Sequence, residues 1–221
     1  MLLFGIAIAP VIAIVWYILF KDKLNKEPVK MLIFTFLFGV VSVIPAVLLE
    51  VFGGDLLGNV NSTIKAILQA FIVVAFSEEL CKYFFLRKFV FNRKEFDEPF
   101  DGIVYAVMIS MGFAALENVM YVLEGGLSVG ILRMFTAVPA HATFAILMGY
   151  WVGKAKMENK PYLNWIGLAT AVVFHGLYDV FLLSELFEWQ LIGALVSLAV
   201  GMVLARSAIK IHQKYKVNFE N

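Results

Sequence analysis

Residues 64–86 read IKAILQAFIVVAFSEELCKYFFL, an apolar stretch long enough to cross a bilayer that nevertheless carries two glutamates and a lysine in its second half. A helix needs about 20 apolar residues to cross a hydrocarbon core of about 30 Å. Similar blocks recur along the chain, and together they cover residues 2–20, 31–52, 64–86, 101–123, 132–153, 162–183 and 189–208. This pattern predicts an all-α membrane protein, a polytopic bundle of about seven transmembrane helices.

The composition agrees with a membrane protein. Apolar residues make up 62% of the chain and charged residues 16%, whereas soluble domains average about half and a quarter. The connections between the blocks are short, so we expect residues 1–221 to form a single membrane-embedded domain. A net charge of +1 gives no indication of a nucleic-acid partner, and the lipid bilayer is the expected surrounding.

Basic residues gather in alternate loops. Of the 18 lysines and arginines, 15 fall in residues 21–30, 87–94, 154–160 and 206–216. The loops between them, GGDLLGNVNST, EGGLSVG and SELFE, contain none. Cytoplasmic loops carry the excess of positive charge, so we expect the N-terminus outside and the C-terminus in the cytoplasm. The first block meets its lysines on its far side, so it is expected to be a retained span rather than a signal peptide.

Several ionisable residues interrupt the apolar blocks. Each costs about 2.5–3.5 kcal/mol when placed at the centre of a membrane helix. They are Glu78, Glu79, Lys82, Glu117, His141, His175 and Asp179. Such groups are expected to face the interior of the bundle, and a function is the default hypothesis for them. Their distances from the predicted outer ends of the blocks indicate a cavity that is reached from outside.

The spacing of these residues predicts specific pairs. Lys82 follows Glu78 by four positions and Glu79 by three, so it can pair with either carboxylate on a helix. His175 and Asp179 are also four positions apart, which allows the carboxylate to orient the imidazole. Asn118 adds an amide beside Glu117.

These residue types suit the activation of water. Two carboxylates in a site of low dielectric repel each other, so one of them is expected to hold a proton while Lys82 keeps the other ionised. An acceptor and a donor then lie side by side, as general acid–base catalysis requires. The two histidines are suited to polarising a carbonyl group or stabilising its oxyanion. The alternative for each pair is a purely structural ion pair or hydrogen bond.

Other residues have simpler explanations. Gly149 and Gly153 form a GxxxG pair, which is typical of close helix packing. Arg133 lies near a predicted outer end, where its long side chain can extend to the interface. The single cysteine, Cys81, excludes an internal disulfide and is expected to be a packing residue.

Four segments of the chain resemble, in order, the motifs of PrsW-type intramembrane proteases. The first resembles the EExxK motif of that family, the second its FxxxEN element, and the last two supply its histidines. They read SEELCKYF (77–84), DGIVYAVMISMGFAALENVMY (101–121), RMFTAVPAHATFAILMGY (133–150) and HGLYD (175–179). The resemblance covers residues 64–183.

The resemblance implies a glutamic-type endopeptidase of the bacterial plasma membrane, distantly related to the CAAX prenyl endopeptidase and Abi superfamily. Such an enzyme makes the first, external-side cut in a single-pass anti-sigma factor, which leads to release of an extracytoplasmic-function sigma factor. By analogy, one glutamate activates water while the histidines support the attack and the oxyanion. The implied catalytic residues are Glu78, Glu79, His175, His141 and Glu117, supported by Lys82, Asp179 and Asn118, with no metal or other cofactor.

Two other functions fit the same residues. A carboxylate and two histidines can hold zinc, as in a ceramidase-like membrane hydrolase, which a chelator would inhibit. Buried carboxylates and histidines also form proton relays in transporters and sensors, although the chain shows no inverted repeat. The sequence leaves open which glutamate is the base and indicates no oligomeric state.

Overall fold

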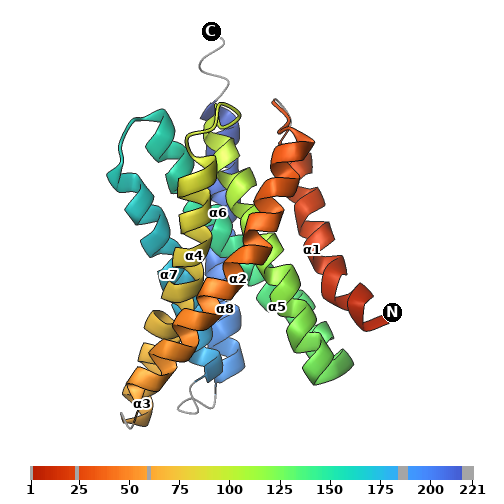
Figure 1. The fold of residues 1–221 in the computed structure, drawn as a ribbon, viewed down its shortest axis with the longest axis vertical. Helices are drawn as coiled ribbons and strands as arrows, with labels where there is room; N and C mark the ends of the chain where they lie inside the picture. The colour runs from red at the N-terminus through yellow and green to blue at the C-terminus, as the bar shows by residue number, and fades with distance from the viewer. Residues whose placement is uncertain (1, 23–24, 59–60, 184–188, 216–221) are drawn as a thin grey trace.

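Long apolar helices build the molecule, a computed structural model that describes residues 2–22, 25–58, 61–183 and 189–215 (Figure 1). The predicted loop SELFE, at 184–188, lies outside these ranges. In chain order the helices are α1 (Leu2–Lys21), α2 (Val29–Leu57), α3 (Ser62–Leu68), η1 (Gln69–Phe76), α4 (Ser77–Phe85), η2 (Leu86–Val90), α5 (Pro99–Phe135), α6 (Ala137–Met157), α7 (Tyr162–Leu183) and α8 (Gln190–Tyr215). No strand occurs in the described residues, so the all-α prediction is confirmed.

Five stretches of the described helices are long and apolar enough to cross a membrane. They are Leu2–Lys21, Val29–Leu57, Pro99–Met157, Tyr162–Leu182 and Gln190–Lys214. The third stretch contains both α5 and α6, which pack against each other. The predicted span 64–86 lies within α3, η1, α4 and η2, which follow one another directly over residues 62–90 with helical φ and ψ at each junction. The chain is therefore a multi-pass membrane protein, while the count of seven spans stays a prediction.

The chain reverses inside α5, at a glycine. The segment EGGLSVG (124–130), expected to be a loop, is helical except at Gly126, where φ is 72° and ψ is −159°. Glycine adopts a positive φ without steric cost, so it permits this kink. Past the kink, Gly130 lies against the side chains of Ile6 and Val122. The last turns of α5 thus fold back toward the middle of the molecule.

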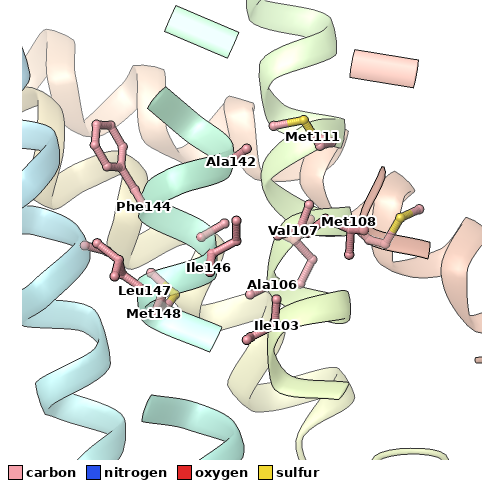
Figure 2. Packing of buried hydrophobic residues seen from close by; sticks show 14 of the residues in the cluster. Ile103, Ala106, Val107, Met108, Met111, Ala142, Phe144, Ile146, Leu147 and Met148 are labelled. Carbon is pink, nitrogen blue, oxygen red and sulfur yellow. The ribbon is translucent and has the colours of Figure 1, made fainter. Parts of the chain in front are cut away.

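Close backbone contacts join α5 to α6. A Cβ added at Gly149 would collide with the carbonyl oxygen of Gly102, and one added at Gly153 with that of Pro99. The interpretation of the GxxxG pair as a packing element is therefore confirmed. Further along, the two helices interdigitate apolar side chains in the main core (Figure 2). Those labelled in the figure are Ile103, Ala106, Val107, Met108, Met111, Ala142, Phe144, Ile146, Leu147 and Met148.

Helices α2 and α5 also touch through glycines. A Cβ at Gly39 would collide with the carbonyl oxygen of Ile109, and a Cβ at Gly112 with that of Phe36. Figure 1 shows the two helices crossing near this level and diverging toward the end of the molecule where α3 lies. The two helices are therefore in backbone contact at the crossing and splayed toward the end where α3 lies.

The end of the bundle that carries the basic loops is held by polar contacts. Asn25 donates to Asp97 with a distance of 3.0 Å, and the hydroxyl of Tyr105 donates to Glu27. Burial raises the pKa of the Glu27 carboxyl to about 10, because the loss of water disfavours its charged form. These contacts fix the loop between α1 and α2 to the start of α5.

Replacement of Gly149 by alanine tests the contact between α5 and α6. Because the new Cβ would collide with backbone that cannot rotate away, we expect Gly149→Ala to lower the stability by about 1–3 kcal/mol. The matched control is Gly54→Ala in α2, where a Cβ would meet nothing within 4 Å. Thermal unfolding in detergent measures both, and equal unfolding temperatures would contradict the packing described.

Candidate active site

Helix α4 brings two carboxylates and an ammonium group to one buried face. Glu78, Glu79 and Lys82 are 5%, 1% and 3% exposed. The Nζ of Lys82 lies 2.9 Å from Glu78 Oε2 and 2.8 Å from Glu79 Oε1, so it donates to both carboxylates. The sequence predicted a pair with either acid. Both pairs form because both acids lie within reach on the same side of the helix.

The third contact of Lys82 fixes the protonation pattern of His141 on α6. Nζ of Lys82 lies 3.2 Å from His141 Nδ1. An ammonium group has three donors and no acceptor, so Nδ1 must accept. The proton of the neutral imidazole is then on Nε2, which lies 2.8 Å from Glu117 Oε2 on α5. His141 therefore donates to Glu117.

His175, on α7, lies between two carboxylates. Its Nδ1 is 3.0 Å from Glu79 Oε1, and its Nε2 is 3.2 Å from Asp179 Oδ2. The predicted pair of His175 with Asp179 is thus present. Carboxylates accept hydrogen bonds at both nitrogens only if both carry protons, so the arrangement suits an imidazolium. The ring of Phe144 stacks on the imidazole at 4.9 Å between centroids and fixes its plane.

The folded-back end of α5 adds a residue whose position the sequence did not indicate. Arg133 was expected to extend to the interface, yet its Nη2 lies 2.7 Å from Glu117 Oε2 and its Nε 2.8 Å from Asn118 Oδ1. Asn118 in turn donates to the carbonyl oxygen of Ala7 on α1, at 2.8 Å, rather than to Glu117. The reversal at Gly126 explains the difference, because it turns Arg133 inward.

A cavity of about 430 Å³ adjoins these groups. Its walls are mostly apolar, and its ionisable lining residues, tyrosines included, are Glu50, Glu78, Glu117, Tyr121, Arg133, His141, His175, Tyr178 and Asp179. Glu78 belongs to this lining, whereas Glu79 does not and is buried behind it. Adjacent residues on a helix point about 100° apart, so the two glutamates are not equivalent. Of the pair, Glu78 is the one that faces the space where a substrate would lie.

Glu50 also lines the cavity and was not singled out in the sequence. The apolar block was predicted to end at residue 52, which places Glu50 near the membrane surface, where a charge needs no explanation. Helix α2 continues to Leu57, so Glu50 lies about two turns inside its end. The sequence could have indicated this residue, because Glu50 is an ionisable residue in an apolar block. It was not singled out because the block was predicted to end two residues later.

Three of the buried ionisable side chains are of types that bind metal ions. Glu78, Glu79 and His175 each offer a ligand atom within 4.8 Å of the others, and zinc binds such groups. Lys82, however, already donates to both carboxylates. A metal ion held by the same oxygen atoms would displace Lys82, and a buried charge that loses its partner costs several kcal/mol. The arrangement therefore fits an ammonium group better than a metal ion.

Comparisons with known proteins agree with the motifs. Residues 27–206 match the family described as PrsW family intramembrane metalloprotease. Protease PrsW of Geobacillus kaustophilus is 36% identical over 185 residues, which cover 83% of this chain and 80% of that protein. Protease PrsW of Bacillus subtilis is also 36% identical, over 82% of this chain and 83% of its own. Protease PrsW of Clostridioides difficile is 34% identical, over 86% of this chain and 82% of its own. No solved structure matches the chain.

Removal of the Lys82 ammonium group tests whether its pairs with Glu78 and Glu79 stabilise the protein. Lys82→Met leaves two buried carboxylates without their cation, so we expect a loss of about 3–5 kcal/mol in stability. Thermal unfolding in detergent measures the loss. The control Lys88→Met removes an exposed ammonium group and should change stability by less than about 0.5 kcal/mol.

A double variant distinguishes the loss of charge compensation at Lys82 from the loss of its packing. Because Glu78→Gln removes one of the two uncompensated charges, the double variant Glu78→Gln with Lys82→Met should recover part of the lost stability. A Lys82→Met protein that unfolds at the wild-type temperature would show that the ion pairs do not hold the helices together.

Proposed function

Because the chain belongs to the PrsW family of intramembrane proteases, we propose that it cuts a membrane-anchored protein with water activated by Glu78. The observation that carries this proposal is that Glu78 lines the cavity while Glu79 lies behind it. A general base must reach the proton that it removes, and of the two adjacent glutamates on α4 only Glu78 meets this condition.

The other groups support Glu78. Glu79 is held by Lys82 and His175, at 2.8 and 3.0 Å, so it positions both cations. Lys82 places its positive charge 2.9 Å from Glu78 Oε2 and orients that carboxylate. His175 and His141 line the same cavity, and the positive charge that His175 carries between its two carboxylates stabilises the negative charge that develops on the carbonyl oxygen.

The reaction follows from these roles. Glu78 takes a proton from a water molecule, whose oxygen forms a bond with the carbonyl carbon of the scissile peptide. The carbonyl oxygen becomes an oxyanion beside the histidines. When it re-forms the carbonyl, the C–N bond breaks and the proton passes from Glu78 to the leaving nitrogen. The products are a carboxylic acid and an amine, and Glu78 is again a carboxylate.

We further propose seven spans, with the N-terminus outside and the C-terminus in the cytoplasm, and a cut near the outer face. The cavity is lined by Glu50 near the end of α2 and by Leu191 near the start of α8, away from the basic loops. Positive loops mark the cytoplasmic side. This position supports a cut outside the cytoplasm. The resemblance of the motifs then points to a single-pass anti-sigma factor as the substrate.

The family's description also names a metalloprotease. Zinc in contact with Glu78, Glu79 and His175 would supply a Lewis acid and an activated water, but the hydrogen bonds of Lys82 to both carboxylates oppose this assignment. We therefore propose hydrolysis that does not depend on a metal.

Cleavage by purified variants in liposomes tests the role of Glu78, with a single-pass anti-sigma factor as the substrate. General acid–base groups typically contribute 10²–10⁴-fold, so we expect Glu78→Gln to lower kcat by at least about 100-fold while the protein stays folded. Glu124→Gln, at an exposed position on α5, is the control and should cut at the wild-type rate.

Different results would contradict the role of Glu78 and the choice of substrate. A folded Glu78→Gln protein that cuts normally would rule out this glutamate as the base. If the wild-type protein cuts other single-pass membrane proteins but no anti-sigma factor, the proposed substrate is wrong and the protease assignment stands.

A further inference from the structure

The cavity has one wall from α2 and a facing wall from α5. Val43, Val47 and Glu50 line it from α2, and Phe113, Glu117, Met120 and Tyr121 from α5. Val43 and Phe113, next to the glycine crossing, are 4% and 2% exposed. Val47 and Met120, farther from it, are 42% and 44% exposed. The side chains next to the crossing are thus buried, whereas those farther along both walls are more exposed.

The figure agrees with this gradient. Below the crossing, α2 and α5 diverge, and α8 is visible between them (Figure 1). Leu191, Ala194 and Leu195 of α8 line the same cavity, so α8 forms its back. The splayed half of the bundle therefore has two side walls and a back wall.

Close contacts fill three other contacts between helices around the cavity. Gly53 of α2 lies against Val73 of η1, where an added Cβ would be 3.2 Å from the valine. A Cβ at Gly176 of α7 would collide with the ring of Phe71 on η1, and one at Gly193 of α8 with the ring of Phe181 on α7. Side chains thus fill the contacts of α2 with η1, η1 with α7 and α7 with α8.

The size of the cavity shows how much of a substrate fits inside. A membrane-spanning helix about 30 Å long and 10 Å wide occupies about 2,400 Å³, against about 430 Å³ in the cavity. Only a short segment of a substrate fits, and the rest must stay outside, in contact with lipid. A substrate helix that stays in the bilayer would therefore reach Glu78 from the side, between two helices of this chain.

We propose that one transmembrane helix of the substrate enters sideways between α2 and α5, on the splayed side of their glycine crossing. This inference rests on the proposed function. The exposed Val47 and Met120 offer apolar contacts that replace lipid. The scissile segment must unwind before water can attack, and in lipid its freed N–H groups need partners. The Glu50 carboxyl group on the α2 wall accepts hydrogen bonds from those groups.

Photo-crosslinking tests the path. A photoreactive amino acid is placed at Val47 or at Met120, in Glu78→Gln protein that binds but does not cut, with the single-pass anti-sigma factor of the cleavage assay as the probe. We expect crosslinks from both positions to the transmembrane segment of the probe. Val196, 56% exposed on α8 but outside the cavity lining, is the control and should give none.

A bulky side chain at the same place gives an independent readout. Val47→Trp narrows the opening, so it should lower cleavage of the membrane-bound substrate at least about tenfold, whereas Val196→Trp should leave it unchanged. Glu50→Gln should lower cleavage less than Glu78→Gln, since an amide oxygen still accepts a hydrogen bond.

The outcomes separate this inference from the proposed function. Crosslinks at Leu191 or Leu195 but not at Val47 or Met120, with normal cleavage, would place the path beside α8 and overturn the inference. Full activity of a folded Val47→Trp protein would also overturn it. If wild-type protein cuts no membrane substrate, the proposed function itself fails.

Discussion

A buried ammonium group is the feature on which the site depends. Nζ of Lys82 donates to Glu78 and Glu79 and lies 3.2 Å from Nδ1 of His141. Ionisable groups inside a membrane helix are tolerated only when they face the interior and pair with one another. Lys82 meets this requirement for α4 and α6 together, and His175 connects α7 to the same network through Glu79. The Lys82 ammonium group thus both holds the helices together and orients the groups that would act on a substrate.

The helix packing leaves room for this cluster to reach a substrate. Glycines bring α2 into backbone contact with α5 near Gly39 and Gly112, and α5 into contact with α6 near Gly102 and Gly149. Beyond the crossing, α2 and α5 diverge and the cavity lies between them. A bundle packed equally tightly along its whole length would satisfy the buried charges but would exclude the peptide bond. The tight half supplies stability, and the splayed half supplies the space that hydrolysis requires.

Local spacing made much of the cluster predictable. Positions three and four apart on a helix face the same side, which anticipated the pairs of Lys82 with the glutamates and of His175 with Asp179. The contacts that were missed depend on tertiary structure. Arg133 reaches Glu117 only because the chain reverses at Gly126, and a glycine in an apolar segment does not reveal such a reversal. Glu50 was overlooked because α2 is longer than the predicted block. The long range contact of Asn118 with Ala7 has no local signal at all.

The central claim is that Lys82, rather than a metal ion, occupies the place between the two glutamates. The most direct test is the cleavage rate of purified wild-type protein in liposomes, before and after treatment with a zinc chelator and after zinc is returned. A rate that the chelator leaves unchanged, in protein that contains less than stoichiometric zinc, is the result predicted here. Loss of cleavage with the chelator and recovery with zinc would contradict the account and assign Glu78, Glu79 and His175 to a metal centre.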